Sequence, residues 1–215
     1  MALARLFTTL GDLIIRRLGD TGGPPSSRVS SELDNIIAWA NLEADRTLYT
    51  NISVGTLSNS TTETSLFSLV TASTGSSRQV PGNSAIAGTA YRLYVYGSVN
   101  STGTPNITFR AKYGATTLST TTGALANNTA GHFQMVVEFL FHAVGASGTM
   151  AEFHFFEYAA TANGAVTPLR ISGGAGTVGS LDTTSNKDLD LTFQFGTANA
   201  ANNINPHGVY LTRLR

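Results

Sequence analysis

Apolar and polar residues alternate through most of the chain after Thr64, and this period of two predicts half-buried antiparallel strands. In the clearest case, residues 132–143, one side of the strand consists of Phe133, Met135, Val137, Phe139 and Phe141. The same alternation is found in residues 91–96, 106–112 and 188–195. Shorter segments bring the total to about eight predicted strands: 65–72, 150–158, 165–171 and 208–214.

About eight antiparallel strands joined by uneven, Gly-, Asn- and Thr-rich loops are typical of a two-sheet jelly roll. No segment with a helical period separates consecutive strands, so a parallel α/β fold is excluded. We therefore predict an all-β domain, a two-sheet antiparallel jelly roll, over residues 49–215.

The first part of the chain has a different pattern. Apolar residues recur there at spacings of three and four, which predicts an amphipathic helix: Leu3, Leu6, Phe7, Leu10, Leu13, Ile14 and Leu18. A Gly- and Pro-rich stretch at residues 19–27 follows and predicts a hinge. A second helix is expected to begin at Ser31, with Asp34 in the place of the capping-box carboxylate.

Charge supports a boundary between these two regions, because residues 1–46 hold 11 of the 26 charged side chains. We therefore expect residues 1–48 to form a short helical N-terminal anchor arm. Two short helices make no core by themselves and need a partner. The side chains expected to dock the arm onto a larger particle are Leu6, Phe7, Leu10, Ile14, Ile36, Ile37 and Trp39.

Composition excludes several classes of function. The net charge is zero, with 13 basic and 13 acidic residues, so we expect no nucleic-acid partner. Cysteine is absent, which removes disulfides and thiolate metal sites. Charged residues interrupt the apolar N-terminal segment, so it is predicted to be neither a signal peptide nor a membrane-inserted helix.

Few residues suggest bound ligands or metals. Residues 174–179 match the dinucleotide-binding pattern GxGxxG, but no helix is predicted after them, so we interpret them as a turn. His132, His142 and His154 are expected to be exposed strand residues, with a zinc site as the alternative. His207 is expected in a turn. No cofactor or metal is predicted.

Three carboxylates lie in the central predicted strands: Glu138, Glu152 and Glu157. We expect them on solvated strand faces, although Glu138 and Glu152 opposite each other on neighbouring strands would suit a glycan hydrolase. No nucleophile-elbow or P-loop motif is present, so the chain is predicted not to be an enzyme. Tyr94, Tyr96 and Tyr210 are expected to be exposed, where they suit sugar stacking or contacts between copies.

Residues 64–158 resemble the small β domains of tailed-bacteriophage virion proteins, such as tail-fibre modules and head decoration proteins. The resemblance is carried by TSLFSLVTASTGSSRQVPGNSAIAGTAYRLYVYGSVNSTGTPNITFRAKYGATTL and by GHFQMVVEFLFHAVGASGTMAEFHFFEY. The family pattern includes G-S-R-x-[IV]-P-x-N-x-x-x-x-G-T, in which this chain has one additional Ser between Gly75 and Arg78. The resemblance implies a trimeric jelly roll on the virion and brings no catalytic residues with it.

Three functions remain open. We favour a capsid decoration or cement protein, because the chain ends at Arg215 directly after its last predicted strand and leaves no separate receptor-binding domain. The first alternative is a short tail fibre or spike that binds a host-surface receptor, and an enzyme is the least favoured. The expected partners are two further copies of the chain, capsid or tail and neck proteins of the virion, and a host-surface glycan in the fibre alternative.

Overall fold

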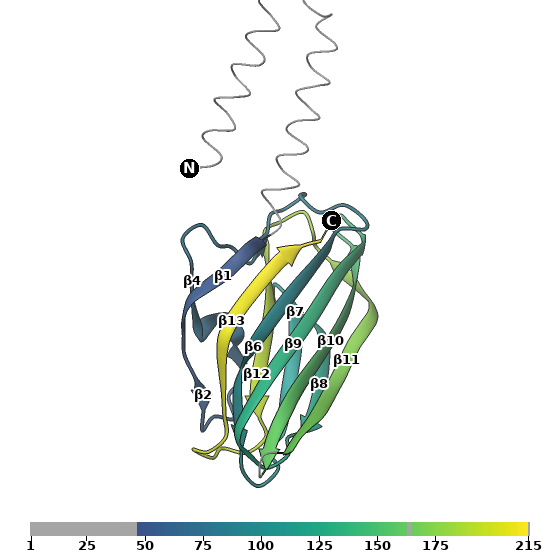
Figure 1. Ribbon diagram of the computed structural model, residues 1–215. Helices are drawn as coiled ribbons and strands as arrows, with labels where there is room; N and C mark the ends of the chain where they lie inside the picture. The colour runs from purple at the N-terminus through teal and green to yellow at the C-terminus, as the bar shows by residue number, and fades with distance from the viewer. Residues whose placement is uncertain (1–46, 163–164, 215) are drawn as a thin grey trace, which may run out of the picture. The chain divides into compact units, whose positions relative to one another are not determined.

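The computed structural model describes residues 47–162 and 165–214. These residues form two antiparallel β-sheets that pack face to face (Figure 1). The predicted all-β, two-sheet fold class is confirmed. The predicted helical arm and its hinge at residues 19–27 lie outside the described residues.

The larger sheet has the strand order β11-β10-β9-β6-β13-β1-β4, and β2 pairs with β13. Its bounds are Thr47–Val54 for β1, Leu57–Ser58 for β2, Val70–Ala72 for β4, Ala90–Ser101 for β6, Asn128–Ala143 for β9, Gly148–Ala162 for β10, Ala165–Leu181 for β11 and Asn203–Arg213 for β13. The long strands β6, β9, β10 and β11 lie side by side in Figure 1 and make up most of its area.

The smaller sheet has the order β3-β12-β7-β8, and β5 pairs with β12. Its strands are Thr64–Ser65 for β3, Gln79–Val80 for β5, Asn106–Tyr113 for β7, Thr116–Ala124 for β8 and Lys187–Phe195 for β12. The 3₁₀ turn η1, Leu66–Ser68, joins β3 to the larger sheet.

The antiparallel pairs are nested along the chain, as in a jelly roll. β7 pairs with β8, β6 pairs with β9 outside them, β3 and β5 pair with β12, and β1 pairs with β13. Along the chain, the long hairpin of β10 and β11 comes between β9 and β12. In space it pairs with β9 and extends the larger sheet at one edge.

Aromatic rings hold the two sheets together. Phe109 on β7 and Phe156 on β10 have ring centroids 4.9 Å apart, so this contact crosses between the sheets. Phe133 stacks on Phe156 at 5.2 Å, and Phe193 meets Phe109 edge-on at 5.5 Å. All four side chains are buried. Burial of each one contributes about 1.5–3 kcal/mol to folding.

The alternation predicted for residues 132–143 is confirmed in β9, because each of the five predicted apolar positions is buried. The inward positions of β12 are also buried: Leu189, Leu191, Phe193 and Phe195. β5 ends at Val80, directly before Pro81, which has no amide hydrogen for a further strand pair. Gly88 adopts a φ of +89°, a conformation that favours glycine.

Other strand predictions need correction. The predicted strand at residues 65–72 is two short strands, β3 and β4, that belong to different sheets. The Ser65 hydroxyl accepts a hydrogen bond from the Phe67 amide at 3.2 Å and starts the 3₁₀ turn between them. β1 and β8 were not among the predicted strands, and β1 begins at Thr47, two residues before the predicted domain boundary.

Candidate interaction face

The outer face of the larger sheet, the face that points away from the smaller sheet, carries a line of apolar side chains. Tyr94 on β6 is in register with Tyr210 on β13 and with Val136 on β9. Val136 is in register with Phe155 on β10. These four residues, here called the aromatic row, therefore lie side by side across four strands. None of them is fully buried.

Tyr96 lies beside the aromatic row and is held in place by its neighbours. Its ring stacks on the ring of Tyr210, with centroids 6.3 Å apart and planes 15° apart, and lies 6.2 Å from the ring of Tyr94. The ring also covers Gly208, where a Cβ atom would collide with it. A hydrogen bond with Tyr96 raises the pKa of the Tyr210 hydroxyl. The three tyrosine rings therefore already contact one another within a single chain.

A hollow of about 570 Å³ adjoins the tyrosines on the same face, here called the tyrosine hollow. Its lining includes Tyr94, Tyr96, His132, Gln134, Glu157 and His207. The Tyr94 hydroxyl donates a hydrogen bond to the side-chain oxygen of Gln134 at 3.3 Å. The hollow combines aromatic rings with groups that donate and accept hydrogen bonds, so it can take either a polar side chain or a sugar ring.

Charges on the outer face occur in pairs of opposite sign. Arg92 donates two hydrogen bonds to Oε1 of Glu138, at 2.8 and 2.6 Å, and both side chains are about half exposed. Arg170 is in register with Glu157, and its guanidinium lies 4.3 Å from the ring centre of Phe155. Such exposed pairs add little to stability, but they leave the face without a net charge.

Residues 174–179 border this face, and the turn predicted for them is wrong. They lie within β11 and pair with β10, for example Glu152 with Ala175. Small residues leave a second hollow of about 560 Å³ over this stretch, with Leu140 and Phe153 among its lining. The Cβ atom of any residue replacing Gly174 would collide with the carbonyl oxygen of Glu152, so close strand packing explains that glycine. No phosphate-binding helix follows in the described chain.

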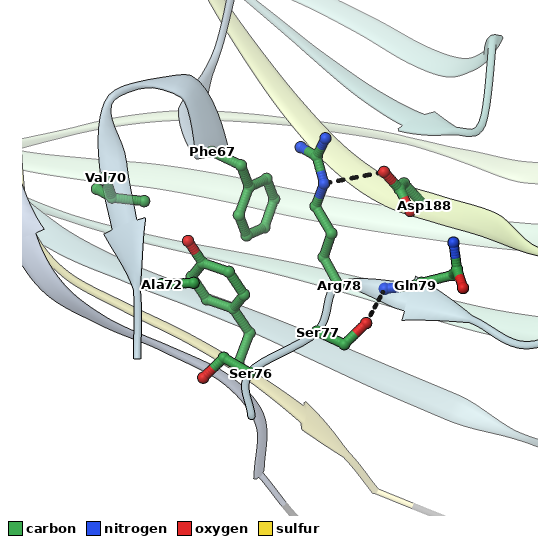
Figure 2. Close-up of a pocket in the computed structure, with 9 residues that line it drawn as sticks. Phe67, Val70, Ala72, Ser76, Ser77, Arg78, Gln79 and Asp188 are labelled. Atoms are coloured by element: carbon green, nitrogen blue, oxygen red, sulfur yellow. Dashed lines mark hydrogen bonds and ion pairs between the residues drawn. The ribbon is translucent and has the colours of Figure 1, made fainter. Parts of the chain in front are cut away.

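A separate groove of about 370 Å³ lies beside β1, β4 and β5 (Figure 2). Arg78 dominates it, and its Nε donates to Oδ2 of Asp188 at 3.0 Å. The Arg78 guanidinium also lies 4.9 Å from the ring centre of Phe67 and 3.6 Å from Oδ2 of Asp190. Burial raises the pKa of the Asp190 carboxyl. The two aspartates therefore neutralise the Arg78 charge within the chain. These contacts of Arg78 attach the loop before β5 to β12.

Glu152 and His154 are both buried between the sheets, which corrects the prediction that they are exposed. Oε1 of Glu152 lies 2.8 Å from Nδ1 of His154, and the Ser119 hydroxyl lies 3.5 Å from the same nitrogen. Oε2 of Glu152 and Nε2 of His154 have no hydrogen-bond partner among the described residues. Because Glu152 and Ser119 share one nitrogen, they do not form a relay through the imidazole.

The two carboxylates considered for glycan hydrolysis lie on opposite faces of the larger sheet. Glu138 is in register with Phe153 and points outward, whereas Glu152 is in register with Phe139 and points into the core. They cannot flank one substrate. Glu157, which was expected on a solvated face, is half-buried at the tyrosine hollow.

The histidines do not gather in one place either. His132 and His142 are exposed on the outer face, as predicted, whereas His154 is in the core. No group of three or more potential metal ligands is found among the described residues. His207 lies within β13 rather than in a turn. The predicted docking residues lie outside the described residues: Leu6, Phe7, Leu10, Ile14, Ile36, Ile37 and Trp39.

Tyr94, Tyr96 and Tyr210 are partly exposed on the outer face, as predicted. Val136 and Phe155, which complete the aromatic row, were not predicted from the sequence. The sequence did contain an indication of an outward aromatic ring. Residues 150–158 carry phenylalanine at both odd and even positions, which point to opposite faces of a strand, so at least one ring must point outward.

A scan against protein-family models finds no match to this chain, and a search of curated proteins finds none with significant similarity. Among the described residues, no helix has the length and apolar character needed to cross a membrane.

Proposed function

We propose that this chain is a structural subunit of a virus particle, a capsid decoration or cement protein that assembles through the outer face of its larger sheet. The observation that carries the proposal is the aromatic row across β13, β6, β9 and β10. A contiguous apolar line with paired charges beside it is the arrangement expected of a protein–protein interface.

The jelly-roll architecture supports a structural role in a virion, since capsid proteins are among the proteins that use it. The sequence resemblance of residues 64–158 to phage virion domains points in the same direction and implies a homotrimer. In this proposal residues 1–46 dock onto capsid, tail or neck proteins, and the two packed sheets, here called the sandwich, are displayed on the virion surface. No nucleic acid, membrane or cofactor takes part.

The proposal assigns no catalytic activity to the chain. Glu138 and Glu152 point to opposite sides of the larger sheet, so they do not supply a paired acid and base. Incubation with host-surface polysaccharide should leave the length of the polymer unchanged. Shortening that disappears in Glu138→Gln would contradict this part of the proposal.

The second candidate is a short tail fibre or spike that binds a host-surface glycan. The tyrosine hollow is the observation that favours it, because Tyr96 offers a ring face beside the polar side chains of Gln134 and His132. A glycan array probed with the purified chain separates the candidates. Saturable binding that is lost in Gln134→Ala favours the fibre or spike, whereas decoration predicts no such binding.

Labelling intact particles with antibodies against the sandwich, followed by electron microscopy, tests the location. A decoration protein gives label distributed over the head. Label confined to the tail favours the fibre, and particles without label contradict the virion assignment altogether.

A further inference from the structure

We infer that a second copy of this chain covers the outer face of the larger sheet, an inference that rests on the proposed use of this face for assembly. The side chains to be covered are substantial. Tyr96 and Tyr210 are each 39 % exposed, and Phe153 is 47 % exposed. Tyrosine is among the residues that contribute most to binding when they are buried at the centre of an interface.

The charges of the face suit a copy of itself. Arg92 is neutralised by Glu138, and Arg170 is in register with Glu157, so each positive charge has a negative neighbour. Two such faces can meet without net electrostatic repulsion. Charged side chains at the edge of one face can then form ion pairs with those of the other. A nucleic acid or an acidic glycan would instead require an excess of Lys and Arg, which the described residues of this face do not provide.

The uncharged polar groups of the face are also self-complementary. Tyrosine hydroxyls and the Gln134 amide each donate and accept hydrogen bonds, as the contact between Tyr94 and Gln134 already shows within one chain. A copy placed against the face therefore presents both donors and acceptors to these groups. The tyrosine hollow supplies the recess into which a side chain of the other copy fits.

The size of the face matches an interface between folded proteins. Five neighbouring strands, β13, β6, β9, β10 and β11, give it a width of about 24 Å, and ten residues of strand give a length of about 33 Å. The resulting area is roughly 800 Å², which is about what each partner buries in a standard stable complex. One copy is therefore large enough to cover the aromatic row.

The test is the mass of the full chain in solution, measured by light scattering over a dilution series. The wild type should form an oligomer whose mass is a multiple of 22.5 kDa. Tyr94→Glu places a charge at the centre of every interface and should raise the concentration for half-dissociation at least about 30-fold. The matched control is Thr120→Glu on β8, an exposed position of the smaller sheet, which should dissociate as the wild type does.

Circular dichroism melts of both variants establish that the sandwich is folded. A wild type that stays monomeric at tens of micromolar overturns the inference, and so does an oligomer that Tyr94→Glu leaves unchanged. A monomer that binds a neutral glycan in the tyrosine hollow also overturns it. The proposed function fails separately, when the chain is an oligomer but is absent from particles.

Discussion

Oε1 of Glu152 lies 2.8 Å from Nδ1 of His154 between the two sheets, and neither side chain reaches solvent. Apolar side chains of β9 lie beside the pair, with Val137 in register with His154 and Phe139 in register with Glu152. Each residue is therefore the main polar partner of the other, and losing one leaves the other isolated in the core.

We predict that Glu152→Ala or His154→Ala destabilises the sandwich by about 3–5 kcal/mol, because each leaves a buried polar group without its partner. The matched control is Glu138→Ala, which breaks the exposed pair with Arg92 and should cost no more than about 1 kcal/mol. Urea unfolding followed by circular dichroism measures all three. If Glu152→Ala and Glu138→Ala lowered the free energy of unfolding equally, the buried pair would contribute no more to stability than the exposed pair.

Two glycines on neighbouring strands should respond differently to a methyl group. In Gly208→Ala the new Cβ meets the ring of Tyr96, which can swing away, so folding stability should change by less than about 1 kcal/mol while the ring leaves its stack. In Gly97→Ala the Cβ meets the carbonyl oxygen of Asn205, which cannot move freely, and the cost should be about 1–3 kcal/mol.

Near-ultraviolet circular dichroism reports the tyrosine stack, and urea unfolding reports the stability of these two variants. Gly208→Ala should also weaken association of the chain, since Tyr96 lies on the outer face beside the aromatic row. If Gly208→Ala kept the near-ultraviolet tyrosine spectrum and the association of the wild type, the rings of Tyr96 and Tyr210 would not form the ordered stack described above.

The sequence predicted those strands in which the apolar residues occupy every second position and mostly polar residues occupy the positions between them. β9 and β12 are such strands, and their inward faces were identified correctly. β8 was missed because Thr116–Ala124 is almost entirely Thr, Ser and small residues, so no apolar face alternates with a polar one along it. The length of β11 was missed for the same reason, because its glycines carry no alternating side chains.

The burial of Glu152 and His154 could not be found from alternation. In β10 the inward positions are Met150, Glu152, His154, Phe156 and Tyr158, whereas the outward positions include Phe153 and Phe155. Neither parity is consistently apolar, so the polar pair was assigned to solvent. Only the pairing of β10 with β9, which brings Val137 and Phe139 beside the pair, decides which face is the core.

Alkaline pH should destabilise the protein through Tyr113. Its hydroxyl is buried without a hydrogen-bond partner among the described residues, and burial, aided by the charge of Asp182, raises the pKa of Tyr113 to about 12. In the unfolded chain the Tyr113 hydroxyl ionises near pH 10. In the folded state it therefore keeps its proton to a higher pH. Stability is therefore complete below about pH 10 and falls as the pH rises toward 12, by roughly 2 kcal/mol.

Tyr113→Phe is the matched variant for this effect. At pH 7 it should be as stable as the wild type or more so by up to about 1 kcal/mol, because a buried hydroxyl without a partner is removed. Between about pH 10 and 12 it should lose less stability than the wild type. Parallel pH profiles for the two proteins would show that Tyr113 does not titrate as its burial requires.

Deleting residues 1–46 should leave a soluble sandwich that melts cooperatively but no longer attaches to particles. The deletion keeps all of β1, whose pairing with β13 includes Tyr49 with Leu211, and the buried core lies within the described residues that remain. Thermal melting and co-sedimentation with particles measure the two effects. Aggregation of the shortened chain would place the arm in the core or the oligomer interface, and retained attachment would place docking on the sandwich.

Electron cryo-microscopy of intact particles shows whether this sandwich is a virion subunit whose larger sheet faces another copy of itself. We expect density for the sandwich on the particle surface, with Tyr94 and Tyr210 buried against a neighbouring copy. Sandwich density whose outer face is open to solvent, or particles that lack the protein, would contradict it.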